Sequence, residues 1–213
     1  MKKEKLTKFS DIMYYYKWHM IIAAVMIIVV AYFAVECHNK VEDDITVTAI
    51  LSNYALSTAA EDVENDMVSN GLIPDLNGDG TNKMFAHIIT FPIKPQNQEE
   101  MMAGQQVSVA FAADDSVLFL IDEDLLEMYE DDEIFNDISR VAELQGVSEE
   151  DLYIAEDGTV MGISLKDNEY LESKGIPTKT LYACYRYALH SDNSDEYQAK
   201  VDVADKILAH IMK

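Results

Sequence analysis

The sequence predicts an α/β protein: an N-terminal transmembrane helix followed by a single layered domain with a mixed, largely parallel sheet flanked by helices. Three observations carry this expectation. One uncharged run near the N-terminus is long enough to cross a bilayer. Downstream, short apolar or β-branched runs alternate with amphipathic helical patterns, which is typical of layered α/β domains. No internal repeat or low-complexity tract interrupts the alternation, so we expect one domain at 45–213.

An apolar segment at residues 19–36 predicts the transmembrane helix. Its uncharged core spans about 24 Å as a helix, and the flanking residues extend it toward the roughly 30 Å hydrocarbon core of a bilayer. Four aromatic residues precede this core and form a belt of the kind found at membrane interfaces: Tyr14, Tyr15, Tyr16 and Trp18. We therefore expect residues 19–36 to contact the lipid bilayer.

The distribution of charge predicts the orientation of this helix. The chain carries 16 basic and 39 acidic residues, for a net charge of −23. Five of the basic and three of the acidic residues lie within 1–37, which leaves 11 basic and 36 acidic residues downstream. The five basic residues within 1–37 are all lysines, and all of them precede the apolar core. The positive-inside rule therefore places a basic stub at 1–18 in the cytoplasm. An acidic linker at 37–44 then leads to an extracellular domain of a single-pass cell-membrane protein. Cleavage as a signal peptide near residues 29–31 is the alternative.

The overall composition excludes several classes of protein. A sequence pI near 4.3 argues against a nucleic-acid partner, because phosphate contacts need a basic face. Two cysteines, Cys37 and Cys184, are too few for a disulfide-rich scaffold. We favour two free thiols, with Cys184 buried, although a disulfide between the two remains open.

The domain begins with a strand–helix–strand unit. Residues 45–51 alternate and are β-branched, which predicts a strand. Apolar residues recur every three or four positions from Leu56 to Met67, ahead of Gly71, which predicts an amphipathic helix. Residues 84–93 alternate again and predict the second strand, closed by prolines.

A second helix and a buried strand follow. The pattern at 98–113 is helical, and the wholly apolar run at 117–121 predicts a strand buried on both faces. Asp122 is expected to cap a short helix, and the acidic run at 122–133 to form its solvated face.

The C-terminal half is less regular. Asp157-Gly158 lies between two β-rich stretches and predicts a hairpin. A helical turn, a strand and a final amphipathic helix are expected at 168–174, 181–189 and 193–212, respectively.

Polar residues next to the predicted strands are the candidate ligand contacts. Ligands of α/β folds usually bind at loops beside the carboxyl ends of strands. Six loop residues are candidates on this basis: Asn53, Tyr54, Asp114, Asp115, Asp122 and Glu123. No nucleophile elbow, phosphate loop, metalloprotease motif or acid–base pair accompanies them, so we predict no catalytic residues. The expected function is non-enzymatic binding of a protein partner or a small ligand.

The loop at 75–80 suggests a second function. Oxygen-bearing side chains alternate at Asp75, Asn77 and Asp79, and Gly80 permits a sharp turn, as in the first half of an EF-hand-type calcium loop. Thr81 would add its backbone carbonyl. The alternative hypothesis is therefore a Ca²⁺-dependent surface or regulatory protein. A solvent-exposed turn explains the same residues without a metal.

The order of the elements resembles one lobe of extracellular solute-binding proteins of the periplasmic-binding-protein type. The resemblance covers 45–212 as a pattern and rests on four stretches, namely residues 101–106, 114–122, 135–139 and 182–212. Proteins of that family have two lobes, a ligand cleft between them and a transporter as partner, and the resemblance implies these features. The lysine-rich start and the aromatic belt also resemble those of small membrane-anchored proteins of Gram-positive bacteria.

Overall fold

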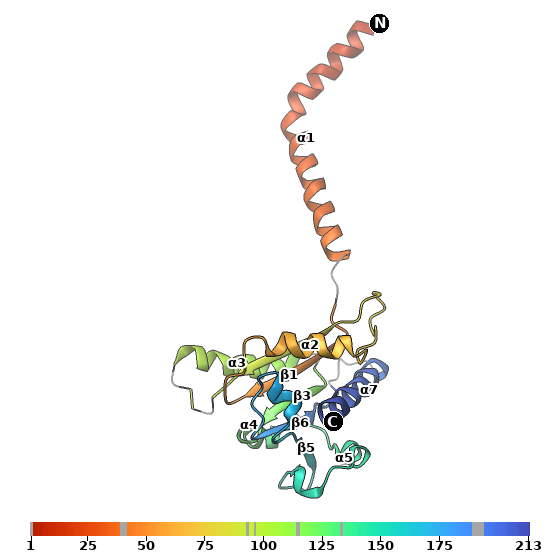
Figure 1. Ribbon diagram of the computed structural model, residues 1–213. Helices are drawn as coiled ribbons and strands as arrows, with labels where there is room; N and C mark the ends of the chain where they lie inside the picture. The colour runs from red at the N-terminus through yellow and green to blue at the C-terminus, as the bar shows by residue number, and fades with distance from the viewer. Residues whose placement is uncertain are drawn as a thin grey trace. The chain divides into compact units, whose positions relative to one another are not determined.

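The computed structural model describes residues 2–38, 42–92, 94–95, 97–113, 116–132, 134–188 and 194–213. The chain divides into two compact units, residues 1–41 and 42–213. The first unit is a single long helix, α1 (Lys2–His38; Figure 1). Among the described residues, α1 is the one helix long and apolar enough to span a membrane, through its segment Tyr16–Phe33. This segment overlaps the predicted span at 19–36.

A six-stranded sheet forms the centre of the second unit (Figure 1). In chain order the strands are β1 (Ile45–Leu51), β2 (Met84–Thr90), β3 (Leu118–Asp122), β4 (Leu152–Ile154), β5 (Val160–Ser164) and β6 (Leu181–Tyr185). Across the sheet they follow the order β2-β1-β3-β6-β5-β4. β1 is parallel to β2 and β3, whereas the β3–β6, β6–β5 and β5–β4 pairs are antiparallel.

Helices connect these strands and cover the sheet. They are α2 (Ala59–Ser69), α3 (Gln98–Ala113), α4 (Glu123–Met128), α5 (Ser139–Gln145), α6 (Glu169–Ser173) and α7 (Ser194–Ile211), with the short 3₁₀ helices η1 (Glu130–Asp132) and η2 (Glu149–Asp151). The α/β class with a mixed sheet flanked by helices is therefore confirmed. The sheet is less parallel than predicted: two of its five strand pairs are parallel, both among the first three strands, and the three pairs added by the C-terminal half are antiparallel.

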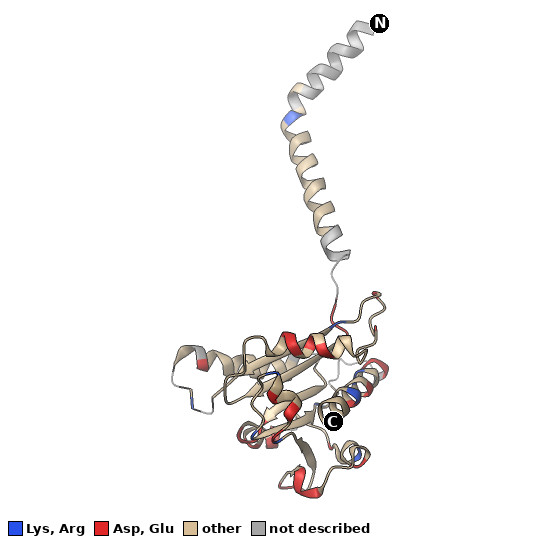
Figure 2. Cartoon of the chain, in the orientation of Figure 1, with Lys and Arg blue, Asp and Glu red and all other residues tan. Residues whose placement is uncertain are grey.

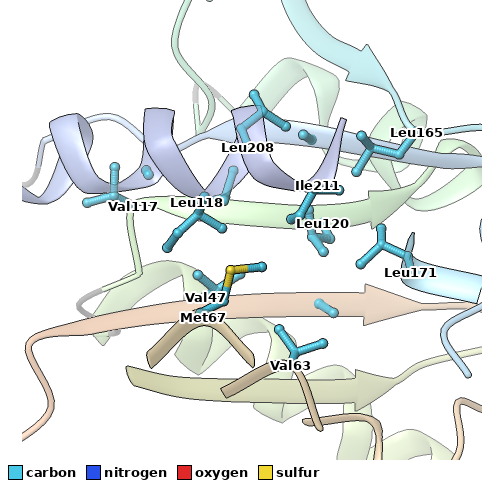
Figure 3. Close-up of a cluster of buried hydrophobic side chains, with 14 of the residues drawn as sticks. Val47, Val63, Met67, Val117, Leu118, Leu120, Leu165, Leu171, Leu208 and Ile211 are labelled. Carbon is cyan, nitrogen blue, oxygen red and sulfur yellow. The ribbon is translucent and has the colours of Figure 1, made fainter. Parts of the chain in front are cut away.

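Strand alternation divides the core between the two faces of the sheet. On β3, Leu118 and Leu120 belong to one hydrophobic cluster, whereas Phe119 and Ile121 belong to the other. The first cluster includes residues of α2 and α7, and Figure 3 shows part of it. The second includes residues of α3 and α4. All five residues of β3 are buried, which confirms the prediction of a strand covered on both faces.

Several boundaries differ from the predicted ones. Helix α2 begins at Ala59, and Leu56 lies before it with 63% of its surface exposed. The Leu56 backbone N–H bonds to the carbonyl of Gly175 in another segment and not within a helix. β6 ends at Tyr185, and the next residue, Arg186, forms an isolated bridge with Phe135. Helix α5 is an additional element. The predicted start of the last helix, Asn193, lies outside the described residues.

Acidic residues occur along several helices and in the loops of the second unit (Figure 2). On α4, Leu125 and Leu126 are buried while Glu123, Asp124 and Glu127 are exposed. The described part of the acidic run at 122–133 thus has the solvated helical face that its spacing predicts. Cys184 is a buried free thiol in β6, as expected.

Candidate functional site

The carboxyl ends of β1 and β3 meet at a switch point in the sheet. The chain leaves β1 through α2 to reach β2 on one side, then crosses through α3 to β3 on the other side. Ligands of open α/β sheets bind at such points. Asn53 and Tyr54 follow β1, Asp122 ends β3 and Glu123 begins α4 directly after it, so the topology brings these four predicted residues to one edge. Asp114 and Asp115 lie outside the described residues.

Asp122 is fully engaged in holding this edge together. It is buried, and its Oδ2 atom accepts a hydrogen bond from the Ser52 backbone N–H at 2.6 Å. The Thr180 hydroxyl donates to Oδ1 at 3.0 Å. No side-chain bond caps α4, so the predicted capping role is wrong: the carboxylate instead points to the neighbouring segments. Because both oxygens have protein partners, we interpret Asp122 as positioning the edge rather than contacting a ligand.

A hollow of about 510 Å³ opens beside this junction, and we call it the mixed-charge hollow. Its lining combines three carboxylates and two lysines: Glu123, Glu150, Asp151, Lys166 and Lys179. Three hydroxyl-bearing residues complete it: Ser164, Thr180 and Tyr182. Glu123 is the predicted ligand residue that lines this hollow. Asn53 and Tyr54 do not line it, and 82% of the Tyr54 surface is exposed.

The antiparallel register of β5 and β6 positions the hollow. Ser164 pairs with Tyr182, and the Leu165 N–H continues the ladder by donating to the Leu181 carbonyl at 2.8 Å. This register brings the residues just after β5 and just before β6 to the same edge as the end of β3, so Lys166 and Lys179 come together there. Sequence reasoning missed both lysines, because neither follows a strand of the parallel half. The one feature of the sequence that could have indicated them is that Lys166 and Lys179 are basic residues in a strongly acidic domain.

Tyr182 links the hollow to the core. Its ring packs edge-on against that of Tyr153 at 5.7 Å, and Gly162 lies between the two strands that carry them. A Cβ atom on Gly162 would lie 3.2 Å from the Cβ atoms of both tyrosines, so glycine permits this close approach. Partial burial, together with the charges of Glu123 and Asp151, raises the pKa of Tyr182. The phenol therefore stays protonated and remains a hydrogen-bond donor at neutral pH.

The predicted calcium loop is a tightly hydrogen-bonded turn. Asp75 accepts the N–H groups of Gly78 and Gly80, at 2.6 and 2.9 Å. Asn77 accepts the N–H of Asp79, and Asp79 accepts that of Thr81. These bonds satisfy the backbone of the turn without a metal. Within the described parts of the chain, no group of three or more His, Cys, Asp or Glu side chains is placed to hold a metal ion.

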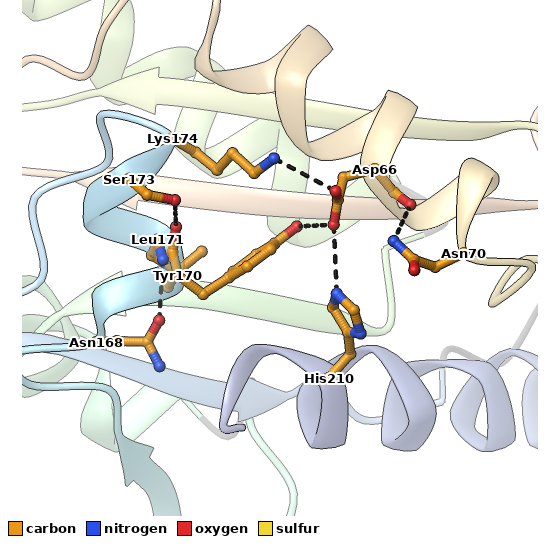
Figure 4. Close-up of polar contacts among 8 residues, drawn as sticks. All are labelled: Asp66, Asn70, Asn168, Tyr170, Leu171, Ser173, Lys174 and His210. Carbon is orange, nitrogen blue, oxygen red and sulfur yellow. Dashed lines mark hydrogen bonds and ion pairs between the residues drawn. The ribbon is translucent and has the colours of Figure 1, made fainter.

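A polar cluster joins three helices on the α2–α7 side of the sheet (Figure 4). Asp66 of α2 accepts a hydrogen bond from the Tyr170 hydroxyl at 2.9 Å and lies 3.3 Å from Nε2 of His210 in α7. Lys174, at the end of α6, forms an ion pair with Asp66 at 3.4 Å. The rings of Tyr170 and His210 meet edge-to-face. Since Asp66 is engaged by all three partners, we interpret the cluster as a contact that holds the helices together.

The Asp66 cluster should make stability depend on pH. Partial burial opposes ionisation of Asp66, but hydrogen bonds from Tyr170 and His210 and the charge of Lys174 outweigh it and lower the pKa of the carboxyl. A carboxyl whose pKa is lower in the folded state stabilises the fold above its unfolded pKa of about 3.9. This contribution is lost as pH falls from there through the lower folded pKa.

Urea unfolding of the wild-type protein and Asp66→Asn across this pH range measures the effect. We expect the gap between their unfolding free energies to be largest near neutral pH and to close in acid. Asp62→Asn, on an exposed position of the same helix, is the control and should show no such gap. A gap for Asp66→Asn that stays constant with pH would contradict the prediction.

Known proteins offer no template for these sites. No protein-family model matches the chain, no curated protein matches it, and no solved structure matches it.

Proposed function

We propose that the chain is a non-enzymatic, membrane-anchored binding module with a solute-binding-like fold, and that it takes a small polar ligand in the mixed-charge hollow. Helix α1 would anchor it in the cell membrane with the N-terminus in the cytoplasm. The orientation rests on the lysine-rich N-terminal segment, since positive charge is retained on the cytoplasmic side. Residues 42–213 would then face the outside of the cell.

One observation supports the binding site above all: the hollow lies where the ends of β3, β5 and β6 meet, one strand from the switch point between β1 and β3. Glu123, which directly follows β3, lines it, and the Glu123 N–H donates to the Thr180 carbonyl at 2.7 Å. The hollow thus lies at the edge of the sheet that holds the carboxyl ends of β1 and β3, where α/β folds usually bind ligands. Polar side chains converge in it from four separate segments of the chain, which suits recognition of a small polar molecule.

The alternative of a Ca²⁺-dependent regulatory protein has less support. In the turn at 75–81, Asp75, Asn77 and Asp79 each accept hydrogen bonds from N–H groups of the turn itself. Such bonds are sufficient to explain why these residue types occur there.

Amide chemical shifts of the isolated fragment 42–213 test the binding proposal. Both hydrophobic clusters lie entirely within this fragment, which forms a compact unit, so it is suited to study without α1. Three pools would be added separately at millimolar concentration: amino acids, monosaccharides and dicarboxylic acids. We expect at least one pool to shift the amides of Glu123, Ser164, Lys166 and Tyr182 in a saturable way.

Charge reversal at both lysines, Lys166→Glu with Lys179→Glu, should weaken or abolish those shifts. Lys206→Glu is the matched control, because Lys206 is an exposed lysine of α7 and does not line the hollow. The proposal fails if no pool shifts any amide of the hollow in the folded fragment. It also fails if the saturable shifts map to another surface.

A further inference from the structure

We propose that the ligand of the mixed-charge hollow is a small zwitterion, a molecule with one anionic group and one ammonium group. This inference rests on the proposed function, since it specifies the chemistry of the same site. The anionic group would be held by Lys166 and Lys179, and the ammonium group by Glu123, Glu150 and Asp151.

The two lysines are not neutralised by the protein. Neither Lys166 nor Lys179 has a carboxylate oxygen within 4.0 Å among the described residues, although three carboxylates line the same hollow. Elsewhere in this acidic domain lysines do form such pairs, for example Lys83 with Asp43 at 2.8 Å. Opposite charges therefore share one hollow and remain apart. A ligand that carries both charges can bridge such an arrangement.

The three carboxylates that line the hollow also accept no hydrogen bond from the described protein groups. In the described structure no hydrogen bond reaches the side chains of Glu123, Glu150 or Asp151, and all three residues are exposed. The contrast is with Asp122, one residue from Glu123, whose two oxygens both accept hydrogen bonds from the protein. Asp122 therefore serves the fold, whereas the carboxylates of the hollow are available to a charged ligand.

The balance of charge disfavours a ligand of a single sign. A simple anion attracted by the two lysines would also meet three carboxylates, in a domain with a large excess of acidic residues. A simple cation attracted by the carboxylates would meet both lysines. Only a molecule with both charges gains favourable contacts with each set, because like charges in close juxtaposition are repelled.

The rest of the lining fits a small and polar molecule. Ser164, Thr180 and Tyr182 offer hydroxyl groups, and the ring of Tyr182 is the one large apolar surface among the lining residues. Protein pockets for small ligands span about 300–1,000 Å³, so a hollow of about 510 Å³ is large enough for a zwitterion of several carbon atoms.

Matched probes test this assignment on the fragment 42–213. Glycine, β-alanine and 4-aminobutyrate are zwitterions with increasing separation between the charges. Each is compared with the carboxylate and the amine of the same carbon number, which lack one charge. We expect at least one zwitterion to bind about tenfold tighter than both of its analogues, measured by saturation of amide shifts in the hollow.

Two variants assign the ends of the ligand. Lys166→Met with Lys179→Met should remove the advantage of the zwitterion over the amine, and Glu123→Gln with Asp151→Asn its advantage over the carboxylate. Lys206→Met should leave both advantages unchanged. If an analogue binds the hollow as tightly as its zwitterion or more tightly, the zwitterion assignment is wrong but the proposed function stands. Binding of sugars alone would have the same two consequences. If no probe or pool binds there, both fall together.

Discussion

Replacing Asp44 with alanine is expected to lower the free energy of unfolding by about 3 kcal/mol, because three backbone N–H groups lose a buried charged acceptor. Asp44 is buried, and its Oδ1 atom accepts the N–H of Leu76 at 2.6 Å and that of Asn77 at 3.2 Å. Its Oδ2 atom accepts the N–H of Lys83 at 2.8 Å. One carboxylate thus ties the middle and the C-terminal end of the loop between α2 and β2 to the residue that precedes β1.

Asp43→Ala is the matched control for this prediction. Asp43 pairs with Lys83 on the surface, where both side chains are substantially exposed, so its loss should cost at most about 1 kcal/mol. Chemical denaturation measures both values, and hydrogen exchange at Leu76, Asn77 and Lys83 reports the loop directly. Equal destabilisation by the two variants would refute the structural role assigned to Asp44.

Alanine at Phe119 should be among the most destabilising substitutions in the chain, at about 3–5 kcal/mol. Phe119 is fully buried in the centre of β3. Its ring lies 5.5 Å from that of Phe111 in α3 and 5.9 Å from that of Phe135. The truncation would leave a cavity where the sheet, α3 and the segment after η1 meet, and it would remove the aromatic contacts of three elements at once.

Two further variants make this test decisive. Phe85→Ala removes a phenylalanine that is 44% exposed on β2, and it should cost less than about 1 kcal/mol. Phe119→Leu keeps most of the volume and should cost about 1.5 kcal/mol or less, so it remains measurable if the alanine variant does not fold. Similar losses for Phe85→Ala and Phe119→Ala would show that the described core does not govern stability.

The parallel half of the fold follows from local sequence patterns. The period of two in β1 and the apolar run of β3 identify strands, and the helical spacing that ends at Met67 identifies α2. Short connections and alternation of strands and helices then favour parallel neighbours. These signals lie within a few residues of one another, which is why a single sequence reveals them.

The antiparallel half depends on pairings that no local pattern specifies. The alternation at 181–189 indicates a strand. Its place between β3 and β5, however, depends on how its two faces pack into the two hydrophobic clusters, one on each side of the sheet. For the same reason the sequence predicts Glu123 as a site residue and misses Lys166 and Lys179. Asp44 resembles a linker residue until its distant N–H partners are known.

The place of β6 has a consequence for biosynthesis. In the folded chain Leu118 of β3 pairs with Tyr185 of β6, so a long stretch of chain must be made before β3 gains its second neighbour. At about 5–20 residues per second, the ribosome needs several seconds to supply it. During that time a strand composed almost entirely of large apolar residues has an open edge, which is the feature that promotes aggregation. Chains truncated before β6 should therefore aggregate instead of forming a smaller stable domain.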